Sequence, residues 1–254
     1  MVDASRWPGK SIVVIIIIMD ADDVTRGRVL GRREVVALLG FSSVALAAGR
    51  TLGQQPGRSA PACVVRPEQT EGPFFVDAKL DRSDIRSDPA TSDVRPGALL
   101  DLVFTVSRLG AGACTPLAGA IVDVWHCDAL GAYSDVRDPH GSTVGQRFLR
   151  GYQTTTAAGS ARFTTIYPGW YQGRAVHIHF KIRTAQGQEF VSQIYFDEAV
   201  TDRVHALEPY ARRGQRRLRN DQDGLFRQGG RQLLVVPVSS GPGYAATFDV
   251  ALSL

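Results

Sequence analysis

The stretch AVHIHFKIR, residues 175–183, alternates between apolar side chains and polar or charged side chains. A second stretch, EFVSQIYF at residues 189–196, follows closely and is rich in aromatic and β-branched residues. Alternation with a period of two is typical of a β-strand whose two faces differ. His177 and His179 are two positions apart, so both imidazoles point to the same face of such a strand.

Other segments also have the composition of strands, and turn residues such as Pro96 and Gly97 separate them. Helical periodicity is weak except over residues 197–211. Several short strands joined by turns are typical of an all-β fold. We predict an antiparallel β-sandwich with long loops that carry the functional site. The other predicted strands are residues 99–107, 118–125, 161–166, 232–238 and 245–252.

The composition excludes several classes of protein. The chain has 254 residues, of which 44% are hydrophobic and 21% charged, so it is neither a disulfide-only miniprotein, nor collagen-like, nor wholly disordered. A formal net charge of +4 is weak for this length and predicts no nucleic-acid partner. Arginines cluster between residues 212 and 219, but Asp221 and Asp223 lie beside them, which favours an ordinary solvated surface.

The N-terminal segment has the features of an export signal. Arg32 and Arg33 precede an uncharged stretch at residues 35–49, which contains the small-x-small pattern Ala45-Leu46-Ala47. Paired arginines indicate the twin-arginine route to the periplasm or the extracellular space. An uncleaved membrane anchor is the alternative; after cleavage no stable membrane span is expected. The predicted organisation is an export signal at 1–47, a flexible linker at 48–62 and a folded domain at 63–254.

The His177-Ile178-His179 triplet allows more than one interpretation. Two imidazoles side by side can bind one metal ion, including zinc or copper, but buried histidines satisfied by hydrogen bonds fit equally well. Tyr133 and Tyr171 both lie near predicted strand ends, beside glycines. Either tyrosine alone is more typical of a core or surface residue than of a metal ligand.

Taken together, these features resemble the intradiol ring-cleavage dioxygenases, the family of protocatechuate 3,4-dioxygenase and catechol 1,2-dioxygenase, and in particular exported single-domain members. The matching segments cover about half of the chain. They are TEGPFF (70–75), PLAGAIVDVWHCDALGAYS (116–134), FLRGYQTT (148–155), FTTIYPGWYQGR (163–174) and HIHFKI (177–182).

The resemblance implies a non-haem Fe(III) ion held by Tyr133, Tyr171, His177 and His179. Phenolates are hard anionic donors that suit ferric iron, unlike the two-His-one-carboxylate set of Fe(II) oxygenases. Tyr167 is a competing candidate, but Tyr171 follows the Pro-Gly frame of the motif. The implied reaction inserts both atoms of O2 into a catechol-type ring and yields a muconate-type diacid.

Two further residues have roles that the resemblance implies. Arg174 lies three positions before His177, where a fixed cation can stabilise negative charge that develops during the reaction. Gln193 lies on the following strand, where its amide can orient a substrate oxygen. A surface arginine and a packing glutamine are the alternatives. The implied role of Tyr171 includes accepting a proton from the catechol.

Three cysteines remain. Export makes a disulfide possible, and we favour a Cys63–Cys114 bond that leaves Cys127 free, although three pairings exist. A secreted, non-catalytic binding module on the same sandwich is the alternative function. The sequence patterns identify neither the particular catechol nor an oligomeric state.

Overall fold

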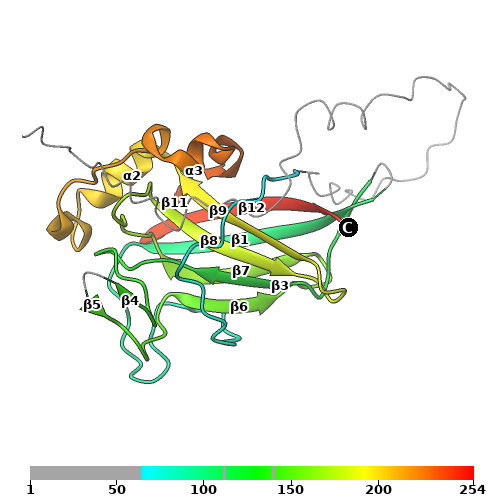
Figure 1. The fold of residues 1–254 in the computed structure, drawn as a ribbon, viewed down its shortest axis with the longest axis horizontal. Helices are drawn as coiled ribbons and strands as arrows, with labels where there is room; N and C mark the ends of the chain where they lie inside the picture. Colours follow the sequence, from blue (N-terminus) through cyan, green and yellow to red (C-terminus); the bar gives the residue numbers. More distant parts are fainter. Residues whose placement is uncertain (1–63, 111–112, 139–140) are drawn as a thin grey trace, which may run out of the picture.

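The computed structural model describes residues 64–110, 113–138 and 141–254 (Figure 1). The predicted export signal, linker and Cys63 therefore lie outside the described residues. Two five-stranded sheets dominate the structure, and a two-stranded hairpin accompanies them. Each predicted strand corresponds to at least one observed strand, so the prediction of an all-β sandwich is confirmed.

The first sheet has the order β11-β12-β1-β2, and β7 also pairs with β1. Every second residue of β1 points into the core: Leu100, Leu102, Phe104 and Val106 are fully buried. This alternation is the pattern that the sequence displays. The strands are β1 (Leu99–Leu109), β2 (Cys114–Pro116), β7 (Ser160–Ile166), β11 (Val238–Ser240) and β12 (Gly243–Ser253).

The second sheet has the order β10-β9-β8-β3-β6. Ile178, Phe180 and Ile182 of β8 belong to the central core, where the Phe180 ring lies 5.3 Å from that of Phe104 in the first sheet. The strands are β3 (Ile121–Trp125), β6 (Arg150–Thr154), β8 (His177–Arg183), β9 (Glu189–Phe196) and β10 (Leu234–Val235).

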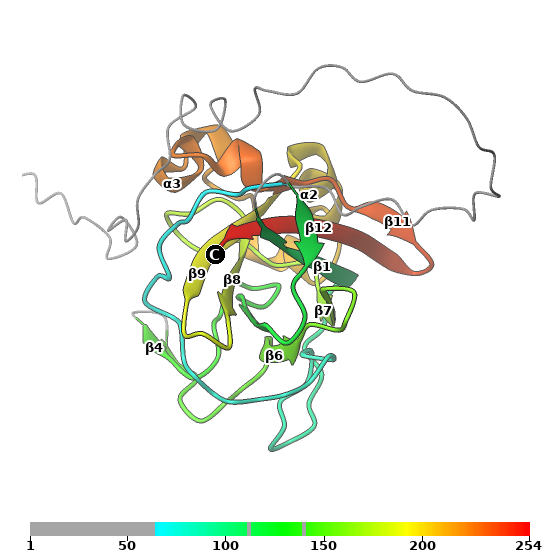
Figure 2. The same cartoon turned by 90° about the vertical axis from the view of Figure 1, so that its right-hand side faces the viewer.

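The sheets are mixed rather than strictly antiparallel. Strand β1 pairs with β12 in parallel, and β10 pairs with β9 in parallel, while the other pairs are antiparallel. The sequence could not reveal this difference, because strand direction depends on the route of the connection rather than on the strand's own residues. Figure 2 shows β12 alongside β1, although they are the last and the first strand of the described chain.

Short elements occupy the connections. The helical pattern at 197–211 forms α2 (Glu198–His205), which Asp197 caps, followed by η2 (Tyr210–Arg213). The strand predicted at 232–238 is instead divided among η4 (Gly230–Leu233), β10 and β11. The remaining elements are β4 (Arg137–Asp138), β5 (Gly141–Ser142), η3 (Asn220–Gln222) and α3 (Gly224–Arg227).

The basic cluster at 212–219 is largely paired with acidic side chains of α2 and its surroundings. Arg216 and Arg219 both contact Glu198 and Asp202. The cluster therefore anchors a loop to a helix, which agrees with the simpler interpretation of its charge. No helix in the described part of the chain is long and apolar enough to cross a membrane.

Candidate metal centre

The predicted histidines face away from the central core, on the outer side of the second sheet. Strand register places Trp125 opposite both His179 and Arg150, and His179 opposite Gln193. Four strands thus contribute one row of side chains on the same face. The Trp125 and His179 rings stack with centroids 5.1 Å apart and an interplanar angle of 4°.

Nitrogen and oxygen atoms from three of the predicted ligands converge on this face. The Nε2 atom of His177 lies 3.0 Å from Nε2 of His179 and 3.2 Å from the hydroxyl oxygen of Tyr133. The Nδ1 atom of His177 donates to the backbone oxygen of Ala175 at 2.7 Å, because a carbonyl can only accept. The Nε2 atom of neutral His177 therefore carries a lone pair that points at Tyr133 and His179.

Burial keeps both imidazoles neutral. Loss of hydration lowers the pKa of His177 to about 3, and it lowers the pKa of His179 well below its ordinary value. Both rings are almost fully buried, and Nδ1 of His179 has no hydrogen-bond partner in the described structure. Neutral imidazoles with available lone pairs are the form in which histidine binds metals.

Two interlocking loops bring the tyrosines to the sheet. Gly131 has a φ of +84°, and a Cβ atom there would lie 2.5 Å from the backbone oxygen of Trp170. A Cβ on Gly169 would lie 2.4 Å from the backbone oxygen of Asp128. Both glycines thus permit a backbone approach that a side chain would prevent. The loop that carries Tyr133 consequently packs against the loop that carries Tyr171.

The two tyrosines differ in burial. Tyr133 is 1% exposed, whereas Tyr171 is half-buried, and their rings meet edge to face with centroids 5.8 Å apart. The competing candidate, Tyr167, belongs to the central core and bonds Thr201 through its hydroxyl at 2.7 Å. The geometry therefore favours Tyr171 over Tyr167.

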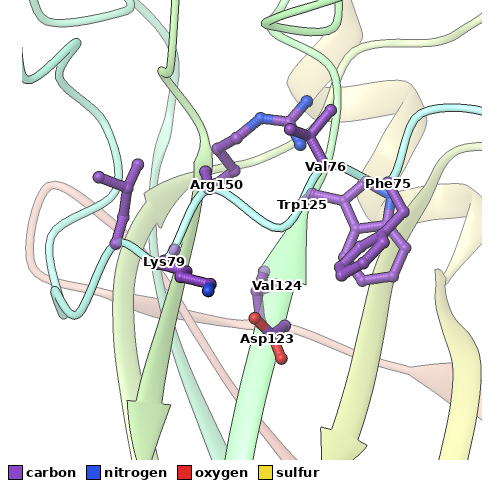
Figure 3. Close-up of a pocket in the computed structure, with 10 residues that line it drawn as sticks. Phe75, Val76, Lys79, Asp123, Val124, Trp125 and Arg150 are labelled. Atoms are coloured by element: carbon purple, nitrogen blue, oxygen red, sulfur yellow. The ribbon is translucent and has the colours of Figure 1, made fainter.

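The segment at 67–77 crosses the outer side of β8 and β9 (Figure 1). Phe74 stacks on Tyr133 with centroids 4.4 Å apart and also contacts Tyr171 edge-on at 5.2 Å. Phe75 packs on Trp125 at 4.8 Å (Figure 3). These aromatic contacts separate the donors from bulk water.

Arg150 ties this segment to the Tyr133 loop. Its guanidinium donates to the backbone oxygens of Phe74 and Ser134 and, at 2.8 Å, to the Ser134 hydroxyl. Burial lowers the pKa of Arg150 to about 10, so the side chain stays charged at neutral pH. The adjoining pocket in Figure 3 has a volume of about 10 Å³, room for at most one water molecule.

The donor set fits a metal that accepts nitrogen and phenolic oxygen. In the described residues there is no group of three or more His, Cys, Asp or Glu side chains that could bind a metal. The converging set instead combines two neutral imidazoles with one phenol, and a second phenol lies beside it. Such a mixed set suits iron.

Comparisons with known proteins identify the family of this chain. A family model described as "Dioxygenase" matches residues 70–223. A solved structure, the intradiol ring-cleavage dioxygenase from Tetranychus urticae, is 30% identical with a TM-score of 0.68, and the match covers 75% of this chain and 95% of that one. The chain belongs to the intradiol ring-cleavage dioxygenase family.

Two curated relatives match over shorter stretches. Chlorocatechol 1,2-dioxygenase from Pseudomonas putida is 27% identical over 162 residues, covering 57% of this chain and 56% of that protein. The protocatechuate 3,4-dioxygenase beta chain from Burkholderia cepacia is 36% identical over 90 residues, covering 32% of this chain and 38% of that protein. The chain therefore spans about half or less of the length of these curated relatives.

In this member of the family, Arg174 and Gln193 lie together. The Nη2 atom of Arg174 donates to Oε1 of Gln193 at 2.6 Å, and both side chains are buried. Tyr195, which sequence reasoning missed, also contacts Arg174, with its hydroxyl 3.2 Å from Nη2. The sequence did contain a signal for Tyr195, because it lies two residues after Gln193 and residues two apart on a strand share a face.

Asp223 is a second missed residue. Its carboxylate accepts from Nε of Arg174 at 3.0 Å, although the two residues are far apart in the chain. No local pattern marks this contact, since it depends on how the C-terminal segment returns to the sheet. Cys127 is free, as predicted, and it is buried, while Cys114 is disulfide-bonded. Cys63, its predicted partner, lies outside the described residues.

Proposed function

We propose that this protein is a non-haem Fe(III)-dependent intradiol dioxygenase that inserts both atoms of O2 into a catechol-type ring. The product is a muconate-type diacid. The observation that carries the proposal is the convergence of Tyr133, His177 and His179 beside Tyr171 in a member of this family. The names of the relatives, which act on chlorocatechol and protocatechuate, support a catechol-type substrate.

Tyr133, Tyr171, His177 and His179 would hold the iron. Two phenolates would offset two of the three positive charges of Fe(III), and the neutral imidazoles add none, so the ferric state is favoured. Bound there, ferric iron would supply the redox chemistry that links the catechol to O2. This role of the iron is the part of the proposal that metal analysis tests.

The chain's own residues bind and orient the catechol. Tyr171 is half-buried, so its side chain can move when substrate arrives and its phenolate can accept a catechol proton. Arg174 is buried and held by Gln193, so its guanidinium supplies a fixed positive charge against negative charge that develops during the reaction. Gln193 also donates to the backbone oxygen of Thr70, which fixes its amide.

Phe74 and its neighbours exclude water from the same space. Phe74 is 7% exposed and covers Tyr133, while the Trp125 ring stacks against the His179 ring from the neighbouring strand. Water excluded from a site strengthens every electrostatic interaction within it. Water therefore does little to screen the guanidinium of Arg174.

The test is a visible absorption spectrum with iron quantification, followed by anaerobic addition of catechol and then product analysis in air. We expect about one iron per chain, a ferric-tyrosinate colour that shifts with catechol, and a muconate-type product. Tyr133→Phe should weaken and shift the colour, because one of the two tyrosinates is lost. Tyr167→Phe is the matched control and should retain it, because the Tyr167 hydroxyl contacts Thr201 in the core.

Two outcomes would contradict the proposal. A protein that stays colourless after ferric loading would lack the two-tyrosinate site, and zinc or copper bound at full occupancy would support the alternative based on the histidine pair. A coloured protein that binds catechols without opening them would support a non-catalytic binding module.

Export forms a separate part of the proposal. It is supported by the Arg32-Arg33 pair, the uncharged stretch that follows, and the disulfide at Cys114, since disulfides are typical of oxidising compartments. The test is expression of the full chain with Arg32 and Arg33 both changed to Lys. Accumulation of uncleaved precursor in the cytosol is expected; unchanged cleavage and export would contradict the twin-arginine route.

A further inference from the structure

Asp223 uses both of its carboxylate oxygens, and each serves a different part of the protein. Oδ1 accepts from the backbone amides of Leu225 and Phe226 at 2.7 and 3.1 Å, which caps α3. Oδ2 accepts from Nε of Arg174 at 3.0 Å and from the backbone amide of Ala175 at 2.7 Å. The side chain is 1% exposed, so water does not compete for these bonds.

Helix capping alone does not account for this arrangement. A cap needs one acceptor oxygen, which Asn or Ser supplies as well as Asp does. The second oxygen of Asp223 instead binds the two residues that lead into β8. The charged pair that it forms with Arg174 is buried on both sides, with side chains 4% and 1% exposed. A buried charge requires such a partner, so each residue holds the other in place.

Arg174 is held at both ends of its guanidinium. Nε binds Asp223, and Nη2 binds Gln193, which stands opposite His179 in the strand register. An arginine side chain has many rotamers, and two directional contacts select one of them. Asp223 therefore fixes the orientation of the Arg174 guanidinium relative to His179 and the side chains in the same row.

The same carboxylate also fixes the backbone that orients His177. The amide of Ala175 donates to Asp223, and the carbonyl of Ala175 accepts from Nδ1 of His177 at 2.7 Å. That carbonyl bond leaves the Nε2 lone pair of His177 directed at Tyr133. One buried acid thus connects to both the arginine and a predicted metal ligand, without contacting the reacting atoms.

We propose that Asp223 is a positioning residue, which holds Arg174 and the Ala175 backbone in the geometry that the site requires. The inference rests on the proposed function of the site. Asp223→Asn is the variant of choice, because its oxygen can still cap α3. Its NH2 group then faces the Nε–H of Arg174 and the N–H of Ala175. All three groups are hydrogen-bond donors, so both hydrogen bonds are lost.

The first measurement is a double-mutant cycle on kcat and KM. Asp223→Asn should lower kcat by about 10²-fold, the cost typical of a small misplacement of a catalytic group, while KM changes much less. Most of this loss should pass through Arg174, so the same substitution made in an Arg174→Ala background should lower kcat by less than about 3-fold, a remainder that the contact with the Ala175 backbone accounts for. A merely structural role would reduce kcat equally in both backgrounds.

The second measurement does not depend on iron or activity. In the metal-free protein, the Nε–Hε NMR resonance of Arg174, assigned by its loss in Arg174→Lys, should exchange slowly with solvent because its proton is bonded to Asp223. Asp223→Asn should shift this resonance and speed its exchange. Val250→Ala is the matched control for lost stability: Val250 is 1% exposed in β12 of the other sheet, so kcat and the resonance should not change.

Each possible result decides the inference. A wild-type kcat in Asp223→Asn, an equal loss in the Arg174→Ala background, or an unchanged Arg174 resonance would overturn it. A loss of kcat in Val250→Ala as large as that in Asp223→Asn would also overturn it. If wild-type protein fails to open any catechol, the proposed function fails, and the resonance alone decides whether Asp223 positions Arg174.

Discussion

The candidate metal centre has a sheet half and a loop half, and different forces hold them. The sheet half comprises Trp125, His177, His179 and Gln193, whose places follow from the register of β3, β8 and β9. The loop half comprises Phe74, Tyr133 and Tyr171, from three segments that lack a common sheet. Backbone pairing positions the sheet half, whereas a few tertiary contacts position the loop half.

This difference predicts how each half responds to change. A side chain on a paired strand can be replaced without moving its neighbours, because the ladder of hydrogen bonds stays intact. A loop held by a close backbone approach or a single buried arginine moves as a whole when that contact is lost. Substitutions at the contacts of the loop half should therefore affect stability and metal binding together.

The largest effect is expected where the loop that carries Tyr133 packs against the loop that carries Tyr171. In Gly169→Val, Cβ would lie 2.4 Å from the backbone oxygen of Asp128 and 2.7 Å from the backbone carbon of Ala129, so the loops must separate. We expect a loss of about 3 kcal/mol in the free energy of unfolding, together with loss of iron binding. Calorimetry and iron quantification measure the two effects.

Gly110→Ala is the control for this prediction, because the nearest atom to its Cβ would be 3.8 Å away. It should leave stability and iron content unchanged. A Gly169→Val protein that keeps wild-type stability and full iron content would show that the loops do not depend on this approach.

The next effect is expected at Arg150. Arg150→Met keeps most of the volume but removes the donors to Ser134 and Phe74, which leaves buried acceptors without partners. We expect a loss of about 2 kcal/mol in the free energy of unfolding and faster hydrogen exchange in the segments around residues 74 and 134. Arg217→Met, at an exposed position, should change neither; equal losses in both variants would contradict the role of Arg150.

The smallest expected effect is the pH dependence of the unfolding free energy, and it arises in the sheet that carries the sheet half. Asp123 lies on the same sheet face as Trp125 (Figure 3), and burial raises the pKa of its carboxyl to about 6, against the opposing effect of Arg183. The folded protein therefore holds this proton more tightly than the unfolded chain, whose carboxyl has an ordinary pKa near 4. The stability that the proton contributes is present below about pH 4 and is lost as the pH rises through about 6.

Asp123→Asn mimics the protonated form at every pH. Relative to this variant, the wild type should lose on the order of 1–2 kcal/mol of unfolding free energy between pH 4.5 and 7.5, measured by urea titration. Asp84→Asn is the control of opposite sign, because a hydrogen bond from Arg86 lowers the pKa of Asp84. A difference between wild type and Asp123→Asn that does not vary with pH would contradict the prediction.

The two halves also differ in how far the sequence predicted them. Alternation at residues 175–183 was enough to predict that His177 and His179 share one face, and the structure agrees. Nothing local predicted that Tyr133 meets His177, and the family resemblance alone suggested it. Asp223 and Arg150 were missed because their contacts are made across the fold and leave no spacing signal in the sequence. The parallel pairing of β1 with β12 was missed for the same reason.

That parallel pair has a consequence for synthesis of the protein. Strand β12 lies inside its sheet, between β11 and β1, yet it is synthesised after every other described strand. Until Gly243–Ser253 has emerged, β1 exposes one edge and the core lacks Phe248, which lies 5.8 Å from Phe104. Until then the nascent chain has an unpaired sheet edge, at which aggregation can begin. Chaperones that bind extended apolar segments should associate with this chain until β12 has emerged.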